Sequence, residues 1–279
     1  MRQVLAIPVP CGLGGPDPNV ARGPNVLAVA GLLEGIPDAG WDAALEAPAG
    51  PRLESLGSLC RSLADRVSAA IIQGSLPLVV GGDHSIAAGT WRGVGRALGS
   101  PPGLVWLDAH LDAHTMATTP SGNPHGMPLA ALLGLGAPEL TGVPGPILDP
   151  HHVCVIGARS FEKSEPALLL GLGVRVFNMD EIHSRGLGSV FAEALAIVGP
   201  DFGLSIDVDV INPLEASGVD TPVPDGVFAS ELLLLLRGLG RLPGCRAIEL
   251  CEYDPARDSD GGTAAIVKSL VLSLFEAGV

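Results

Sequence analysis

Short apolar runs recur along the chain, and each of them ends abruptly at polar residues. Runs of this kind are typical of strands that are buried on both faces of a sheet. They predict strands over 3–9, 76–80, 103–107, 152–156, 174–177, 202–206 and 246–250. Longer segments with helical spacing lie between them and predict helices over 52–73, 85–98, 188–198, 230–239 and 263–277. The alternation of strand and helix predicts an α/β fold with a mostly parallel sheet and helices on both of its faces.

The chain shows no sign of a division into separate units. It has no internal repeat, charge block or long polar linker, so we expect residues 1–279 to form one domain. Hydrophobic residues make up 47% and charged residues 16%, against a usual charged fraction of about 25%, which excludes disorder and implies a large core. Thirty acidic and 16 basic residues leave a net charge of −14, which opposes binding to nucleic acid or to an anionic membrane surface.

The cysteines and the N-terminal segment bear on the cellular compartment of the protein. The five cysteines are scattered, odd in number and without a C-x-x-C pair, which predicts buried thiols in a reducing environment. The N-terminal apolar run is broken by Pro8 and Pro10, and no stretch of about 18 apolar residues occurs anywhere. We therefore expect a cytoplasmic protein with neither a signal peptide nor a membrane span.

The first candidate functional motif follows the predicted strand 76–80. Its sequence is Gly-Gly-Asp-His-Ser, from Gly81 to Ser85. The two glycines permit a tight turn from strand to helix and leave His84 at the end of the strand, where ligands bind in parallel sheets. Taken alone, the motif is explained better by a helix cap from Asp83 or Ser85 beside a structural histidine.

The second motif follows the strand 103–107 and places an ionisable residue at every second position. These residues are Asp108, His110, Asp112 and His114. In an extended segment this spacing puts all four side chains on one face. Carboxylates and imidazoles packed together at the end of a buried strand need a neutralising partner, and a divalent cation accepts both kinds of ligand. A solvated loop is the alternative, and the apolar strand before it argues against an exposed position.

The third motif, Asp207-Val-Asp209, follows the strand 202–206. Two neighbouring aspartates repel each other, and either a metal or a shared proton relieves the repulsion. The two other clusters of ligand residues favour metal. Four aspartates and two histidines are too many for one catalytic zinc, but they suit two cations bridged by carboxylates, for which we expect manganese.

Together and in this order, the three motifs resemble those of the ureohydrolase superfamily, which includes arginase, agmatinase, guanidinobutyrase and formimidoylglutamase. The resemblance spans residues 81–255 and is closest to the arginase branch. It implies a three-layer α/β/α sandwich and a site for two manganese ions that hydrolyses a guanidino or amidino C–N bond. It also implies the ligands: His84 and Asp112 for one ion, His110 and Asp209 for the other, and Asp108 and Asp207 bridging both.

The same resemblance implies roles in catalysis. The nucleophile would be a hydroxide shared by the two ions, and Asp112 could hold it by a hydrogen bond. Glu252, which follows the last predicted strand, matches the carboxylate that pairs with the cationic substrate. His125 matches a histidine that passes a proton to the leaving amine, a role suited to its ordinary pKa of about 6.5.

Two further segments bear on which substrate is bound. Ser121 and Asn123 resemble the arginase residues that contact the α-carboxylate of arginine. Glu162 aligns with an acidic residue, usually Asp, that takes the α-amino group, although a structural bridge from Arg159 to Glu162 is an equal alternative. His114 stands where arginases commonly have Asn, and it could still donate a hydrogen bond to a carboxylate.

These observations rank the candidate functions. The leading hypothesis is a manganese amidinohydrolase that converts L-arginine to L-ornithine and urea. The alternatives are an agmatinase, a guanidino-acid hydrolase or a formimidoylglutamase. A two-metal phosphoesterase lacks basic residues near the motifs, and a non-catalytic scaffold would not keep every expected site residue. The substrate is thus a small guanidino compound, and the family further implies a homo-oligomer, either a trimer or a hexamer.

Overall fold

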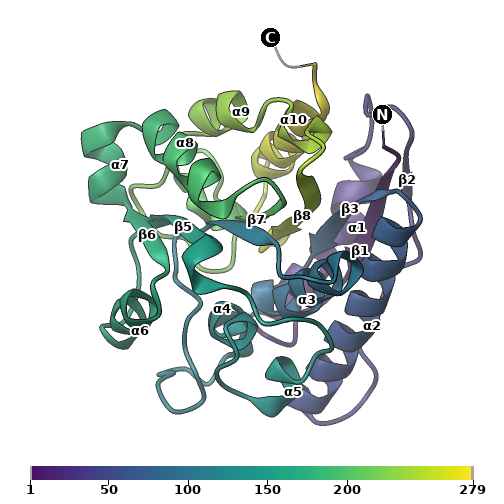
Figure 1. The fold of residues 1–279 in the computed structure, drawn as a ribbon. Helices are drawn as coiled ribbons and strands as arrows, with labels where there is room; N and C mark the ends of the chain where they lie inside the picture. The colour runs from purple at the N-terminus through teal and green to yellow at the C-terminus, as the bar shows by residue number, and fades with distance from the viewer. Residues whose placement is uncertain (1, 278–279) are drawn as a thin grey trace.

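A computed structural model describes residues 2–277 and contains one eight-stranded sheet whose strands all pair in parallel (Figure 1). The strand order is β2-β1-β3-β8-β7-β4-β5-β6. The strands are β1 (Val4–Val9), β2 (Ala39–Trp41), β3 (Leu76–Gly81), β4 (Gly103–Leu107), β5 (Val153–Ala158), β6 (Arg175–Asn178), β7 (Phe202–Asp207) and β8 (Cys245–Cys251). The order places the carboxyl ends of β3, β8, β7 and β4 next to one another at the centre of the sheet.

Helices cover both faces of this sheet, which confirms the three-layer α/β/α sandwich (Figure 1). One face carries α1 (Gly23–Val29), α7 (Met179–Arg185), α8 (Leu187–Val198), α9 (Ala229–Leu236) and α10 (Gly262–Phe275). The other carries α2 (Arg52–Ile72), α3 (Ala87–Leu98), α4 (Pro128–Leu132), α5 (Pro138–Thr141) and α6 (Ser164–Leu172). Short 3-10 turns are η1 (Pro18–Arg22), η2 (His84–Ile86), η3 (Pro124–Gly126), η4 (Pro150–His152), η5 (Val208–Val210) and η6 (Leu239–Arg241).

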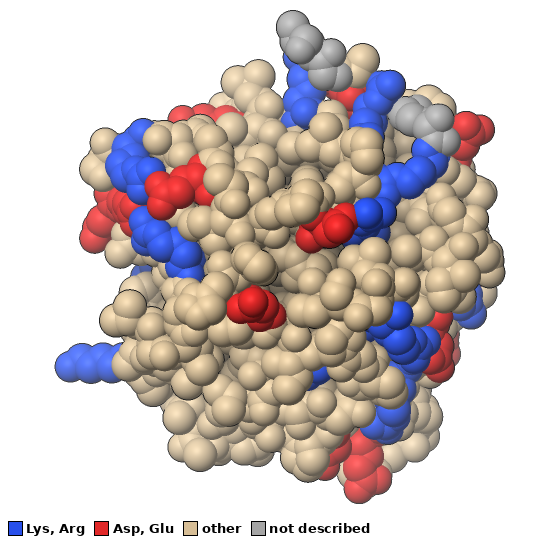
Figure 2. All heavy atoms as spheres, in the orientation of Figure 1, with Lys and Arg blue, Asp and Glu red and all other residues tan. Residues whose placement is uncertain are grey.

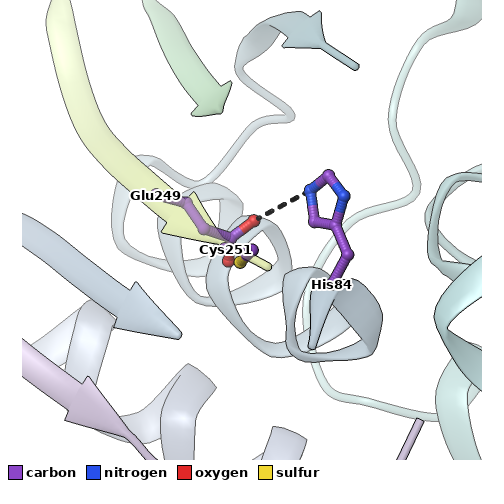
Figure 3. Close-up of side chains that lie close together, drawn as sticks. All are labelled: His84, Glu249 and Cys251. Carbon is purple, nitrogen blue, oxygen red and sulfur yellow. Dashed lines mark ion pairs between the residues drawn. The ribbon is translucent and has the colours of Figure 1, made fainter. Parts of the chain in front are cut away.

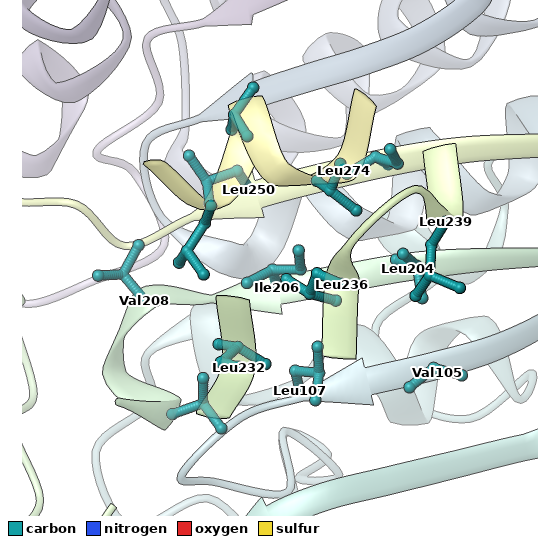
Figure 4. Close-up of a cluster of buried hydrophobic side chains, with 14 of the residues drawn as sticks. Val105, Leu107, Leu204, Ile206, Val208, Leu232, Leu236, Leu239, Leu250 and Leu274 are labelled. Atoms are coloured by element: carbon teal, nitrogen blue, oxygen red, sulfur yellow. The ribbon is translucent and has the colours of Figure 1, made fainter. Parts of the chain in front are cut away.

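The core consists of two apolar clusters, one between each face of the sheet and its helices. Alternate residues of β4 enter opposite clusters: Val105 and Leu107 pack toward α8 and α9, whereas Leu104 and Trp106 pack toward α2 and α3. Figure 4 shows the first cluster, where leucines of α9 and α10 meet the side chains of β4, β7 and β8. Because both faces of each central strand are buried, the strands have continuous apolar sequences.

All seven predicted strands are present, with small changes at their ends. The edge strand β2 was not predicted, because it has three half-buried residues and no apolar run. Helix α6 was also missed, since Leu170 is 80% exposed and its apolar residues do not fall on one face.

The surface charges, the cysteines and the helices bear on the expectations drawn from composition. Figure 2 shows mixed basic and acidic side chains toward the edges of the drawn face, and no broad basic surface on it. All five cysteines are buried and free of disulfides. Within residues 2–277, no helix combines the length and the apolar character that a membrane span requires.

Candidate active site

The first motif forms a close turn between β3 and η2. A Cβ on Gly82 would lie 1.8 Å from the carbonyl oxygen of Cys11, so only glycine fits there. Asp83 is buried, and its carboxylate accepts hydrogen bonds from the backbone N–H groups of Gly14 (2.8 Å) and Ser85 (3.0 Å). The helix-cap interpretation is therefore correct for Asp83, and the turn delivers the neighbouring histidine to the edge of the sheet.

His84 lies in the middle of three carboxylates. Its Nδ1 is 3.2 Å from a carboxylate oxygen of each of Asp108, Asp112 and Asp207. The nitrogen is buried, yet none of these contacts has the geometry of a hydrogen bond. The imidazole stacks on Trp106 with ring centroids 4.1 Å apart, and the indole N–H donates to Asp108 Oδ2 at 2.8 Å. The ring is thus held rigidly with one nitrogen directed at the carboxylates.

The other side of the His84 ring is held by a buried polar chain (Figure 3). Ser205 Oγ lies 2.9 Å from Nε2 and donates its proton to Glu249 Oε1, also at 2.9 Å. Since the hydroxyl has only one proton, it accepts from Nε2–H, and this fixes the tautomer with Nδ1 available as a ligand. Cys251, drawn beside them, is buried, and burial first and Glu249 second raise the pKa of its thiol well above the ordinary value.

The second motif does not continue the strand as expected. The backbone turns after β4, and Asp112 adopts a left-handed φ of 49°. Asp108, His110 and Asp112 converge, but His114 points into a separate cluster, so the prediction that all four share one face is wrong for His114. The left-handed φ of Asp112 is rare for a residue other than glycine, and conformations of this kind are concentrated at functional sites.

A second histidine lies beside a different pair of carboxylates. His110 Nδ1 is 3.0 Å from Asp209 Oδ2 and 3.4 Å from Asp108 Oδ1. Asp108 therefore directs one oxygen toward His84 and the other toward His110. Asp207 Oδ1 accepts the backbone N–H of Asp209 at 2.8 Å, which holds the third motif together.

Arg159 lies behind this third motif. Its guanidinium donates to the backbone carbonyls of Gly157, Asp209, Val210 and the 223–224 loop. The alternative of a bridge from Arg159 to Glu162 is therefore wrong. Arg159 instead fixes the turn that presents Asp209.

The neighbouring carboxylates of this cluster repel one another when they are ionised. Burial, and then the charge of Asp108, raise the pKa of Asp112 to about 7. Burial, and then Asp209, raise the pKa of Asp207 well above its ordinary value. Carboxylate oxygens and imidazole nitrogens are ligands that Mn²⁺ accepts, and Asp108 belongs to two separate ligand groups. The donors therefore fit two cations that share a carboxylate.

Glu252 and His125 form the next part of the site. Glu252 directly follows β8, has a left-handed φ of 67° and is buried. Its Oε1 accepts the backbone N–H of His84 at 2.8 Å and forms a long hydrogen bond of 3.4 Å with His125 Nδ1, whereas Oε2 has no hydrogen-bond partner. Burial would lower the pKa of His125, but the hydrogen bond to Glu252 and its charge outweigh this and raise the pKa to about 9. The unpaired Oε2 is an acceptor suited to a cationic substrate.

A cavity of about 290 Å³ joins these groups to the predicted substrate-binding residues. Its lining includes His110, Asp112, His114, Ser121, Asn123, His125, Glu162, Glu165, Asp207 and Glu252. The structure thus brings every predicted catalytic and substrate-binding residue to one cavity.

His114 occupies this cavity differently from the expectation. Its Nε2 lies 2.7 Å from Glu162 Oε2 and 3.2 Å from Glu165 Oε2, and its Nδ1 lies 3.2 Å from Thr118 Oγ1. Both ring nitrogens have partners within the protein, so none is left to donate to a substrate carboxylate. The hydrogen bond from His114 lowers the pKa of Glu162 and fixes the carboxylate at the edge of the cavity.

Several functional neighbours were not found from the sequence. They are Trp106, Ser205 and Glu249, which hold His84, and Glu165, which accepts the backbone N–H of Ala113 at 3.1 Å. Ser205 and Glu249 had a detectable signal, because each is a polar residue inside an otherwise apolar strand.

A parallel sheet with histidines and carboxylates clustered at its carboxyl edge is typical of metal-dependent hydrolases, and the comparisons specify the family. The model of the Arginase family matches residues 3–276. An arginase of Bacillus caldovelox is 35% identical over 99% of this chain and 98% of its own, and one of Bacillus subtilis is 34% identical over 98% of both chains. The native Bacillus caldovelox arginase structure has a TM-score of 0.92 at 34% identity and covers all of both chains. The chain belongs to the arginase family.

Proposed function

We propose that this protein is a binuclear manganese amidinohydrolase that cleaves L-arginine to L-ornithine and urea. Relatives named arginase, at 34–35% identity over nearly the full length, support this substrate. The observation that carries the chemistry is the buried Nδ1 of His84, which faces three carboxylates without a hydrogen bond. A nitrogen and carboxylates arranged in this way suit a cation between them.

The ligands divide into two groups. His84 and Asp112 would hold one ion, His110 and Asp209 the other, and Asp108 and Asp207 would be shared. Two divalent ions would neutralise these carboxylates and lower the pKa of a water molecule between them, which supplies the nucleophile at neutral pH. Trp106, Ser205 and Glu249 orient the ligands of the first ion through their hydrogen bonds.

Glu252 and His125 act on the substrate. The free Oε2 of Glu252 accepts a hydrogen bond from the guanidinium and holds the reacting carbon beside the carboxylate cluster. Asp112 accepts a hydrogen bond from the attacking water. His125 is protonated at neutral pH beside Glu252 and donates its proton to the leaving amine.

The remaining cavity residues recognise the amino-acid end of the substrate. Ser121 and Asn123 donate to the α-carboxylate, and Glu162, fixed by His114, accepts from the α-ammonium group. Agmatine lacks the carboxylate and leaves these donors unpaired, which costs about 1–3 kcal/mol for each.

The test compares three substrates with manganese-loaded enzyme. Arginine, agmatine and guanidinobutyrate are supplied separately, and urea is measured from each. Arginine should exceed agmatine in kcat/KM by at least about 100-fold, since two unpaired donors at about 1.4 kcal/mol each, within this range, amount to roughly 2.7 kcal/mol. Equal hydrolysis of agmatine would reject the arginase assignment, and no urea from any of the three would reject the hydrolysis of a guanidino substrate.

The cytoplasmic location and the trimeric or hexameric state remain predictions. Sedimentation analysis of the manganese-loaded protein tests the second of these.

A further inference from the structure

Arg52 lies outside every sequence motif but links two loops of the candidate site. It is the first residue of α2, and its guanidinium donates to the backbone carbonyls of Leu13, Gly14 (3.0 Å) and Gly15 (3.1 Å). Its Nη2 also donates to Asn123 Oδ1 at 3.1 Å. All four acceptors are uncharged oxygens, so the positive charge of Arg52 remains unneutralised by these contacts.

This contact determines which way the Asn123 amide points. A guanidinium only donates, so the atom that faces Arg52 must be the amide oxygen, and the NH₂ group is directed elsewhere. Asn123 lines the cavity that contains Glu252 and His125. Arg52 therefore engages the amide oxygen of Asn123 and leaves its NH₂ group as the free donor of a side chain that lines the cavity.

The side-chain oxygen of Ser121 also accepts a hydrogen bond within the protein, as that of Asn123 does. Its hydroxyl oxygen accepts the backbone N–H of Asn123 at 3.2 Å and lies 3.5 Å from Thr119 Oγ1. Ser121 and Asn123 thus each have an acceptor oxygen engaged within the protein while keeping a side-chain donor, which favours a carboxylate over an ammonium group.

The same guanidinium also supports the loop that contacts the catalytic histidine. The carbonyl of Gly14, which accepts from Arg52, also accepts the backbone N–H of His125 at 3.1 Å. Arg52 is therefore connected both to the donors at one end of the cavity and to the backbone of His125.

We propose that Arg52 is a positioning residue that makes the site selective for substrates with a carboxylate, because it orients Asn123 and adds a positive charge beside it. This inference rests on the proposed function, since it assigns the amino-acid end of the substrate to the Ser121–Asn123 segment. A charged hydrogen bond of this kind is worth a factor of about 10 to 100 in binding.

The test uses Arg52→Gln, which removes the positive charge and the planar set of guanidinium donors, and Arg52→Lys, which keeps only the charge. Arg61→Gln is the matched control, because Arg61 is an exposed residue of the same helix whose guanidinium donates to Ser58. Arg52→Gln should raise KM for arginine about 10-fold or more with a smaller effect on kcat, while kcat/KM for agmatine falls far less than kcat/KM for arginine. Arg52→Lys should recover part of this loss, and Arg61→Gln should match the wild type. If Arg52→Gln does not fold, the same kinetic comparison between arginine and agmatine is made with Arg52→Lys.

A double variant isolates the role of the amide. In the Asn123→Ala background, Arg52→Gln should change KM for arginine clearly less than in the wild-type background, because the group it orients is gone and only its charge still acts. Equal losses on arginine and agmatine, or a full effect without Asn123, would show that Arg52 only stabilises the loops and would overturn the proposal.

Calorimetric binding of L-ornithine and putrescine separates this proposal from the proposed function. These two diamines differ only by the carboxylate. A wild type that hydrolyses no arginine refutes the proposed function. In that case Arg52→Gln must still weaken ornithine binding alone, and equal weakening of both ligands refutes the role of Arg52.

Discussion

Asp112→Asn should stabilise the metal-free protein while weakening its capacity to bind cations. Asp112 is buried, and its Oδ2 lies 3.2 Å from His84 in a pocket shared with Asp108 and Asp207. Burial and the charge of Asp108 raise its pKa from 3.8 to about 7. Asparagine keeps the shape of the side chain, tolerates the left-handed φ of 49° and cannot ionise.

The size of the effect follows from this difference in pKa. The carboxyl group ionises above about pH 4 in the unfolded chain but only above about pH 7 in the fold. Its ionisation therefore costs the fold nothing below about pH 4, increasingly more up to pH 7, and the full amount above. About three pKa units at 1.36 kcal/mol each give roughly 4 kcal/mol at pH 8. The cost of burying the amide that replaces the carboxyl group offsets about 1–2 kcal/mol of this, which leaves roughly 2–3 kcal/mol, or about 5–10 °C in Tm.

The assay is thermal unfolding in EDTA at pH 8 and at pH 5, for the wild type and for Asp112→Asn. The gain should be largest at pH 8 and should shrink at pH 5. Added manganese should raise the Tm of the wild type more than that of the variant. Asp225→Asn is the control, because Asp225 also has a left-handed φ, of 66°, but its side chain is 71% exposed. A metal-free Asp112→Asn protein that is less stable than the wild type at pH 8, or equally shifted at both pH values, would refute this account of the cluster.

Three further variants test individual roles. Asp108→Ala should reduce bound manganese, measured by elemental analysis, from two ions to one or none, and two tightly held ions would contradict the shared role of its carboxylate. His125→Asn should lower kcat about 100-fold to 10,000-fold with the metal content intact, and a loss of metal would make His125 a ligand instead. Ser121→Ala combined with Asn123→Ala should reduce the preference for arginine over agmatine by about 100-fold in competition assays, and an unchanged preference would assign the carboxylate to other donors.

The sequence is most informative where the structure buries a strand on both faces. The central strands β3, β4 and β7 have no side exposed to water, so their apolar runs predict their bounds nearly to the residue. Strand β2 lies at the edge of the sheet, and helix α6 exposes apolar side chains to solvent. In both cases the contrast between buried and exposed positions is too weak to produce a pattern.

The candidate site shows a similar division. Residues directly after the strands, such as His84, Asp108 and Asp207, could be brought together from sequence, because parallel strands end at a common edge. The direction of His114 depends on the left-handed backbone at Asp112, for which an alternating sequence gives no signal. The role of Arg52 depends on a contact with Asn123, 71 positions along the chain, which only the folded structure shows.

The place of β8 in the sheet governs when during synthesis the site can exist. Residues 245–251 are the last strand to leave the ribosome, yet β8 pairs with β3 on one side and with β7 on the other. Without β8, no strand connects β2-β1-β3 with β7-β4-β5-β6 by backbone hydrogen bonds. His84 follows a strand of the first group, whereas Asp108 and Asp207 belong to the second. The full set of clustered side chains therefore requires the strand that is synthesised last, and we expect manganese to stabilise only a chain that includes it.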